Sequence, residues 1–157
     1  AREALEGGER YLAEALEGNL DRYDFVFLDC PPAFGPLTVN ALAAADRVIV
    51  PVQAEYYALE GLSQLLNSIN LVKARLNPQL AVAGILLTMT DGRTKLSAEV
   101  EGELRRHFGE LVFTTTVPRS VRLAEAPSHG LPAIAYDRRS TGAQAYWKVA
   151  MELVERS

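Results

Sequence analysis

The stretch that decides the fold is residues 47–89, which read RVIVPVQAEYYALEGLSQLLNSINLVKARLNPQLAVAGILLTM. It opens with an apolar run at residues 47–52 and closes with another at residues 82–89. Short apolar runs without polar alternation are typical of strands that are buried on both faces of a sheet. Between them, residues 57–76 carry aliphatic side chains at three- and four-residue steps, which predicts a helix with one buried face. This order predicts two parallel strands joined by a right-handed crossover.

The same alternation of strand-like and helix-like segments continues on both sides of this stretch. Further strands are predicted at residues 25–28, 112–117 and 133–136, the last as a short edge strand. Helices are predicted at residues 1–20, 37–45, 97–108 and 141–155, with a helical turn at 121–126. Such alternation is typical of an α/β fold with a mostly parallel sheet and flanking helices. Because no repeat or linker-like stretch interrupts the pattern, we expect residues 1–157 to form a single α/β domain.

The composition is that of an ordinary globular protein, with 48% hydrophobic and 23% charged residues. No apolar run reaches the roughly 18 residues of a membrane span, and the first residues are acidic and helix-like rather than typical of a signal peptide. The only cysteine, Cys30, has no partner for an internal disulfide, which agrees with a reducing compartment. We therefore expect a cytoplasmic protein that does not bind a membrane.

The charge is distributed unevenly along the chain. The net charge is −4, which argues against a protein that simply wraps nucleic acid. Residues 1–87 carry 6 basic and 11 acidic side chains, whereas residues 88–148 carry 9 basic and 7 acidic side chains. The second half therefore favours either a local basic patch or an ordinary solvated face, and both interpretations remain open.

Asp29 directly follows the predicted strand at residues 25–28. In an open parallel sheet, ligands bind outside the carboxyl ends of the strands, and this strand would deliver the Asp29 carboxylate to that edge. An apolar strand that ends in Asp is the Walker B pattern, in which the carboxylate orients Mg²⁺ beside nucleotide phosphates. Because Pro31-Pro32 follows, the alternative is that Asp29 only closes a strand before a turn.

A phosphate-binding loop is missing from the sequence. Such a site needs a glycine-rich loop that leads into a helix, with a lysine that holds the phosphates. None of the 11 glycines is followed by lysine, so the motif G-x-x-x-x-G-K-[ST] is absent. We therefore expect these 157 residues alone to bind ATP weakly at most and to be inactive as an ATPase.

Several longer strings are more specific than any single motif. They are LDCPP at 28–32, LTVNALAAAD at 37–46, PVQAEYYALEG at 51–61, LLTM at 86–89, DGRT at 91–94 and VPRSVRLAEAPS at 117–128. Together they resemble the Walker B strand and the segments after it in the ParA/Soj family of chromosome-partitioning ATPases. The resemblance covers about residues 21–155 and indicates the carboxyl-terminal part of such a protein.

The resemblance implies a P-loop NTPase fold of the ParA/MinD-like type with a deviant Walker A loop. It further implies a protein that binds ATP and Mg²⁺, forms a homodimer in the ATP state and binds double-stranded DNA without sequence specificity. A ParB-type partner protein would stimulate hydrolysis, and the cycle would move chromosomes or plasmids at the nucleoid. Which of these two cargoes it moves does not follow from the residues.

The resemblance also assigns nucleotide-site roles by position. Asp29 would be the Walker B carboxylate, which acts in catalysis by orienting Mg²⁺ through water. Met89 and Pro118, at the ends of later strands, and Arg119 beside them would contact the nucleotide.

Two arginines, Arg93 and Arg122, match DNA-contacting arginines of the family. A guanidinium group suits this role because it pairs well with phosphate. The alternative is that both are surface arginines beside Asp91 and Glu125.

The departure from the family pattern leaves two further interpretations open. The family's phosphate loop and its second catalytic Asp lie upstream of the residues present here, and the abrupt start before the predicted Walker B strand favours a fragment over a natural remnant. Such a remnant would be a non-catalytic module that binds DNA or a partner. A MinD-like, membrane-associated relative is the other alternative, but the tail MELVERS, with one positive and two negative charges, would be a poor membrane anchor.

Overall fold

The computed structural model describes residues 8–156, which fall into two compact units. The first unit comprises the residues up to Val48 together with Gln64–Ala81. The second comprises Ile49–Ser63 and the residues from Val82 onward.

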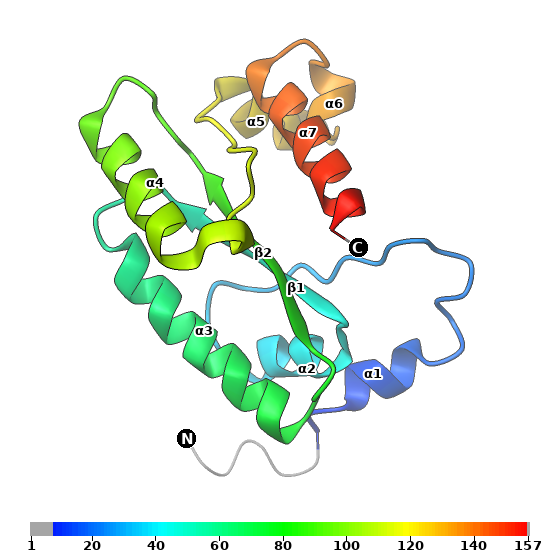
Figure 1. Cartoon of the computed structure of the whole chain (residues 1–157). Coiled ribbons are helices and arrows are strands. Elements are labelled where there is room, and N and C mark those ends of the chain that lie inside the picture. Colours follow the sequence, from blue (N-terminus) through cyan, green and yellow to red (C-terminus); the bar gives the residue numbers. More distant parts are fainter. Residues whose placement is uncertain (1–7, 157) are drawn as a thin grey trace. The chain divides into compact units, whose positions relative to one another are not determined.

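The first unit is helical and contains α1 (Tyr11–Leu16), α2 (Pro36–Ala44) and most of α3 (Ala58–Arg75) (Figure 1). Helix α2 starts with a proline at its first position, where no intrahelical N–H is needed. At its other end the side-chain amide of Asn77 donates hydrogen bonds to the carbonyls of Leu42 at 3.0 Å and Ala45 at 2.7 Å. Asn77 thereby satisfies carbonyls that a helix end otherwise leaves without partners.

The predicted helix at residues 1–20 is only partly found. Helix α1 ends at Leu16, and Gly18 with φ of 72° turns the chain out of the helix. Gly18 accommodates this left-handed conformation because glycine has no Cβ. The start of the prediction, residues 1–7, lies outside the described residues.

The predicted buried strand at residues 25–28 is wrong. These residues form no strand, and Phe25, Val26 and Phe27 are 47%, 44% and 71% exposed. A strand exists only where its amides and carbonyls pair with a neighbour. Within the described part of the chain, no backbone hydrogen bond links residues 25–28 to another segment. The apolar run therefore has the composition of a strand without the partner that would make it one.

The parallel sheet is built from β1 (Arg47–Gln53) and β2 (Ala81–Thr88), as predicted. Near the starts of the strands the Ala81 amide bonds to the Asp46 carbonyl, and near their ends the Ala54 amide bonds to the Thr88 carbonyl. Residues 83–87 of β2 are all buried, which explains the unbroken apolar run. The structure is therefore an α/β fold with a parallel sheet and flanking helices.

The second unit continues after β2 with helical elements, of which those at residues 95–108, 121–125 and 141–155 were expected. In chain order these are α4 (Lys95–Phe108), η2 (Gly109–Leu111), α5 (Val121–Glu125), η3 (Ala126–His129), α6 (Ala133–Tyr136) and α7 (Thr141–Glu155). Its core cluster contains residues of β2, of the segment after η2 and of α7, namely Leu86, Phe113, Val117, Ala145 and Val149. Gly84 allows this packing, because a Cβ there would lie 2.5 Å from the Phe113 ring.

The predicted strand at residues 112–117 is replaced by two separate bridges to β2 and its end, Ile85 with Val112 and Thr90 with Pro118. The Phe113 amide bonds to the Ile85 carbonyl and the Val117 amide to the Leu87 carbonyl. Between these two hydrogen bonds the segment advances by four residues, from 113 to 117, while β2 advances by only two, from 85 to 87. Regular pairing would advance both by the same number. The extra residues bulge away from the sheet and interrupt the strand.

The predicted edge strand at residues 133–136 is also wrong, because these residues form the short helix α6. The amides of Ala135 and Tyr136 both bond to the Pro132 carbonyl, and the Asp137 amide bonds to the Ala133 carbonyl. These local bonds satisfy the backbone without a neighbouring strand. Across residues 8–156, no helix is long and apolar enough to cross a membrane.

Candidate functional site

An open pocket of about 380 Å³ lies at the carboxyl end of β2. It is lined by residues of two loops and by the first residue of α5, namely Thr90, Asp91, Gly92, Arg93, Pro118, Arg119 and Val121. Three of them, Arg93, Pro118 and Arg119, are residues for which the sequence predicts a ligand-binding role. The carboxyl edge of a parallel sheet is where ligands bind in α/β folds.

Backbone hydrogen bonds hold the two loops of the pocket together. The Thr90 amide donates to the Val117 carbonyl at 3.2 Å, and the Arg119 amide donates to the Thr90 carbonyl at 3.0 Å. This pairing continues β2 by one bridge beyond its end and places Pro118 and Arg119 beside Thr90.

Met89 stands between β2 and this bridge in an unusual conformation. Its φ is 51°, the one positive value at a non-glycine residue among residues 8–156, and its side chain is 46% exposed. A left-handed conformation costs free energy for a residue with a Cβ, and such residues cluster at functional sites. Met89 is thus next to the pocket in sequence, although it does not line it.

The turn after Thr90 is closed by its own side chains. The Asp91 carboxylate accepts hydrogen bonds from the amide and the Nε of Arg93, both at 3.0 Å, and from Nη2 of Arg93 at 2.8 Å. The Thr94 hydroxyl accepts from the Ser97 amide and caps the start of α4. The hydroxyl of Ser97, a buried residue, accepts from the Asp91 amide at 3.2 Å. The turn therefore has a fixed shape before any ligand arrives.

The charges in this turn stabilise each other. The side-chain hydrogen bond from Arg93, together with its amide, lowers the pKa of Asp91 to about 2, and the nearby Arg119 adds a smaller attraction. The Arg93 side chain is 90% exposed, and Asp91 occupies only its Nε and Nη2. A guanidinium group carries five N–H donors, so Arg93 retains donors that point to solvent.

Arg122, on α5, is more completely paired than Arg93. Its guanidinium lies 2.9 Å from Glu125 and 3.5 Å from Asp137, and its side chain is 55% exposed. The hydrogen bond with Glu125 raises the pKa of Arg122 further. The Tyr136 hydroxyl donates to the same Glu125 carboxylate at 3.2 Å. Arg122 is therefore held between two carboxylates, close to Val121 of the pocket in sequence.

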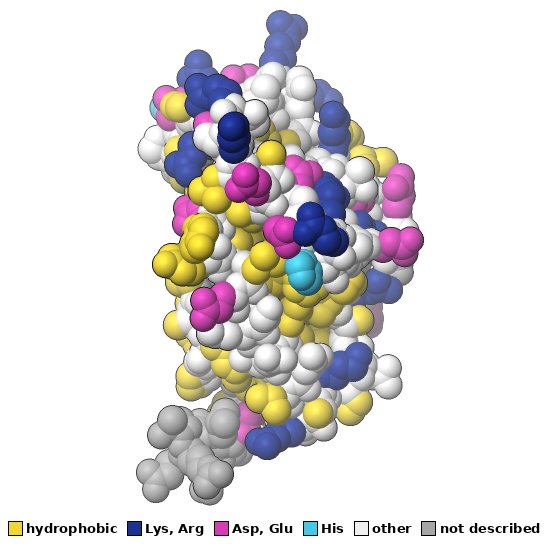
Figure 2. All heavy atoms as spheres, turned by 60° about the vertical axis from the view of Figure 1, so that its left-hand side comes forward, with side chains coloured by type: hydrophobic (Ala, Val, Ile, Leu, Met, Phe, Trp, Pro, Cys, Tyr) yellow, Lys and Arg dark blue, Asp and Glu magenta, His cyan; other side chains and the backbone are white. Residues whose placement is uncertain are grey.

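Six exposed basic residues of the second unit lie in the pocket or close to it. Arg93 and Arg119 line it, Lys95 and Arg122 follow them within three residues, and Arg138 and Arg139 follow Asp137, which pairs with Arg122. Two further exposed basic residues, Arg106 and Lys148, lie on α4 and α7. Figure 2 shows Lys and Arg side chains close together in the upper part of the face drawn, with a few acidic side chains between them. The local basic patch that the charge distribution allows is therefore present, and Asp91, Glu125 and Asp137 partly neutralise it.

Asp29 belongs to the first unit and is exposed. Within the described part of the chain its carboxylate has no hydrogen-bond or ion-pair partner. No group of three or more potential metal ligands occurs among residues 8–156. A Mg²⁺ site needs only one or two carboxylates when phosphates and water supply the other ligands, so Asp29 fits that role but does not make a metal site alone. Its function remains a prediction.

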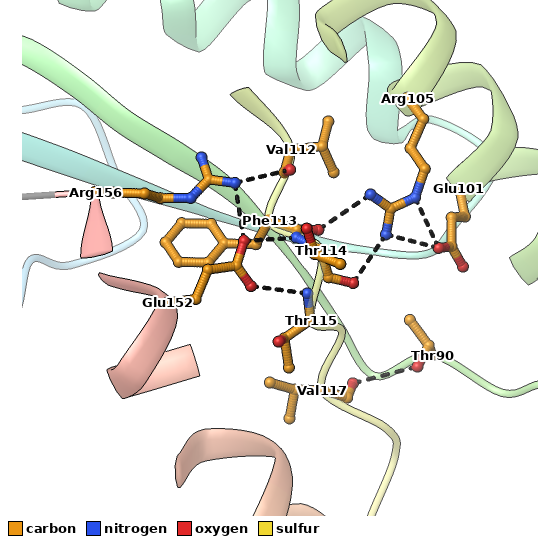
Figure 3. A network of polar contacts seen from close by, with 10 residues as sticks. All are labelled: Thr90, Glu101, Arg105, Val112, Phe113, Thr114, Thr115, Val117, Glu152 and Arg156. Carbon is orange, nitrogen blue, oxygen red and sulfur yellow. Dashed lines mark hydrogen bonds and ion pairs between the residues drawn. The ribbon is translucent and has the colours of Figure 1, made fainter. Parts of the chain in front are cut away.

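A polar network around residues 112–115 was not predicted from the sequence (Figure 3). The Glu152 carboxylate on α7 accepts hydrogen bonds from the amides of Thr114 and Thr115, at 2.7 and 2.9 Å. It also accepts one from Arg156 at 2.8 Å. Burial alone would raise the pKa of Glu152, but these hydrogen bonds outweigh it and lower that pKa. The bulged segment that leads to Pro118 is therefore fixed by side chains.

Arg156 and Arg105 complete this network from opposite sides (Figure 3). Arg156 donates to the carbonyls of Glu110 and Val112 and lies over the Phe113 ring, 4.5 Å from its centre. Arg105 donates to the carbonyls of Phe113 and Thr114, both at 3.2 Å. No local pattern signals these contacts, because Glu152 and Thr114 are 38 residues apart. The Asp91–Arg93 contact, in contrast, follows from the DGRT string itself.

Comparison with protein-family models gives a match of residues 3–82 to a family described as an AAA domain. The Soj protein of Thermus thermophilus, named a chromosome-partitioning ATPase, is 55% identical over 152 residues, which are 97% of this chain and 60% of that protein. The Bacillus subtilis sporulation initiation inhibitor protein Soj is 54% identical over 142 residues, covering 90% of this chain and 56% of that protein. The chain thus spans little more than half the length of these relatives.

Solved structures agree with this similarity. A Mycobacterium smegmatis protein titled cobyrinic acid a,c-diamide synthase, with a bound ATP analogue and magnesium, superposes with a TM-score of 0.79 at 37% identity. The match covers 95% of this chain and 55% of that one. The Pyrococcus furiosus cell-division ATPase MinD, at 24% identity and a TM-score of 0.75, shares the fold over 95% of this chain and 59% of its own. On the sequence matches together with this fold, the chain belongs to the ParA/Soj family of chromosome-partitioning ATPases.

Proposed function

We propose that this chain supplies the DNA-facing part and one side of the nucleotide site of a chromosome-partitioning ATPase. The whole protein binds ATP and Mg²⁺, dimerises in the ATP state and binds double-stranded DNA in the cytoplasm without sequence specificity. A ParB-type partner stimulates its hydrolysis. The observation that carries the proposal is the pocket at the end of β2, where Pro118 and Arg119 meet the Asp91–Arg93 turn.

In the nucleotide role, Met89, Pro118 and Arg119 form the side of the site that contacts the nucleotide. Their placement supports this, because Met89 directly follows β2, and the bridge from Thr90 to Pro118 brings the end of the segment at residues 112–118 to the same edge. Asp29 orients Mg²⁺ through water, for which a carboxylate without other partners is well suited. The phosphate loop that these residues require is not among the 157 residues.

In the DNA role, Arg93 and Arg122 contact phosphates of the backbone. Arg93 has free donors at the surface, and the other exposed basic side chains at this end add an attraction that does not depend on base sequence. Arg122 must share its guanidinium with Glu125 and Asp137, so its contact with a phosphate is weaker. The patch therefore favours non-specific binding in which Arg93 contributes more than Arg122.

The proposal is tested in a longer protein that supplies a phosphate loop ahead of Ala1. We expect this protein to hydrolyse ATP and the 157-residue chain to show no turnover. Asp29→Asn in the longer protein should reduce turnover at least about tenfold by weakening the Mg²⁺ site. Asp24→Asn, at another exposed acidic residue of the same segment, is the matched control and should leave turnover unchanged. Equal turnover in both variants would mean that Asp29 does not orient Mg²⁺ and only precedes the turn at Pro31-Pro32.

A further inference from the structure

The last helix, α7, has one face in the core of the second unit and an apolar stripe on the opposite face. Its buried residues are Gly142, Ala143, Ala145 and Val149. On the other side Trp147, Met151 and Val154 are 55%, 51% and 56% exposed. Large apolar side chains are costly to leave in water, and Trp and Met are enriched in protein interfaces.

The spacing of these three side chains makes them one continuous stripe. Residues four and three positions apart in a helix lie on the same face, so Trp147, Met151 and Val154 follow one another along α7. Lys148 and Glu155 are seven residues apart and flank the stripe on one side, near its two ends. Both are exposed, and neither has an ion-pair partner within residues 8–156.

We propose that this stripe binds the same stripe of a second copy of the chain, with the two α7 helices antiparallel. A two-fold axis near Met151 places Met151 against its own counterpart and Trp147 against Val154 of the second copy. The same axis places Lys148 opposite Glu155 of the second copy, twice in each dimer. In a parallel arrangement the two copies of Lys148, and likewise the two copies of Glu155, would lie on opposite sides of the stripe, so neither charge would meet an opposite one.

Charge complementarity is the reason to choose a second copy as the occupant. An interface with two-fold symmetry requires a surface that is complementary to itself after rotation. The stripe meets this requirement to within one residue. Trp147 and Val154 lie four residues before and three residues after Met151, and the oppositely charged Lys148 and Glu155 lie three residues before and four residues after it. The contact uses neither the pocket at the end of β2 nor a nucleotide, so it is distinct from the ATP-state dimer proposed above.

The 157-residue chain carries its own reporter for this contact, because Trp147 is its only tryptophan. We expect sedimentation equilibrium to show a monomer–dimer equilibrium without nucleotide. Over the same concentrations Trp147 emission should shift to shorter wavelength as its ring leaves water. Met151→Glu should abolish both changes. Leu71→Glu, at an exposed leucine of α3, is the matched control and should leave both unchanged.

Charge reversal tests the antiparallel geometry. Lys148→Glu and Glu155→Lys should each weaken dimerisation about tenfold or more, because each single change creates two like-charge contacts. The double variant Lys148→Glu/Glu155→Lys should restore the wild-type dissociation constant, since it exchanges the charges and keeps the pairing. Far-ultraviolet circular dichroism should be the same in all variants, because these side chains are on the exposed face.

Three outcomes would overturn the proposal. The first is a monomer at every concentration with unshifted emission. The second is a double charge variant as weak as either single variant. The third is a dimer that survives Met151→Glu but is lost in Phe27→Lys, without any shift of Trp147 emission. That last result would place the contact at the exposed apolar run of residues 25–28 instead.

Discussion

The turn at residues 90–94 is closed by hydrogen bonds among its own residues, whereas the segment at residues 25–28 depends on a neighbouring strand for its backbone hydrogen bonds. In the turn, Asp91, Arg93 and Thr94 satisfy one another, and Ser97 anchors the turn to α4. The apolar segment has no such internal partners and forms no strand within the described residues. A turn closed by its own side chains thus forms from local residues alone, whereas a strand needs a neighbour.

Amide hydrogen exchange tests this difference between the two regions most directly. The amides of Val26 and Phe27 should exchange nearly as fast as those of an unfolded chain. The amides of Phe113 and Val117, which bond to buried β2, should exchange on the order of 10³-fold more slowly. In a longer protein that supplies a neighbouring strand, residues 25–28 should become protected too. Equal protection of both regions in the 157-residue chain would show that residues 25–28 are already paired.

The same contrast explains how much of the structure follows from the sequence. The elements β1, β2, α3, α4 and α7 were predicted, because apolar periodicity reports burial of a whole strand or helix face. The predictions of strands at residues 112–117 and 133–136 were wrong. In the first segment two backbone amides bond to the Glu152 carboxylate, and the second segment forms a short helix. A periodicity within one segment carries no information about such partners.

The candidate site, like the fold, was predicted only in part. The pocket brings together Arg93, Pro118 and Arg119, whose short strings carry the family resemblance. The contribution of Glu152 and Arg156 to the segment before Pro118 was missed, because Glu152 lies in α7 and Arg156 directly after it, and that helix reads as an ordinary amphipathic closing element.

The Glu152 network gives the second prediction, on stability. Glu152→Gln should lower the free energy of unfolding by about 1–3 kcal/mol, because the new side chain has one acceptor oxygen, which is neutral, and leaves the other Thr amide without an acceptor. Urea denaturation measures this change. Glu99→Gln, at an exposed residue of α4, is the matched control and should cost less than about 0.5 kcal/mol. A Glu152→Gln variant as stable as this control would mean that the bulge holds its shape unaided.

The pH dependence of this network has a definite sign. Because the folded-state pKa of Glu152 is lowered, its contribution to stability is present above the unfolded-state pKa and is lost as pH falls through the folded-state pKa. The stability difference between wild type and Glu152→Gln should therefore be largest near neutral pH and shrink in acid. A difference that grows in acid would contradict the assignment.

The third prediction concerns the turn itself. Asp91 should titrate with a pKa of about 2, and Arg93→Ala should return it toward the ordinary value of 3.8, because the largest cause of the shift is the hydrogen bond from Arg93. Carboxyl carbon chemical shifts in an NMR titration report this change directly. Arg119→Ala should produce a smaller shift in the same direction, since Arg119 contributes only a weaker attraction. A larger effect of Arg119→Ala would mean that the Asp91–Arg93 hydrogen bonds are not formed in solution.

The last prediction rests on the proposed DNA role and uses the longer, ATP-loaded protein. Arg93→Ala should weaken binding to unrelated DNA sequences by similar factors and flatten the slope of log affinity against log salt by about 0.9 for each phosphate that the variant no longer neutralises. Arg122→Ala should do less, because Glu125 and Asp137 already neutralise its charge, and its removal leaves these carboxylates near the DNA. A further variant separates the two effects, since Glu125→Gln should strengthen binding more in the wild-type background, where it also frees Arg122, than in the Arg122→Ala background. If both arginine variants keep the wild-type salt slope, the basic end of the second unit does not contact DNA, and the pocket serves the nucleotide alone.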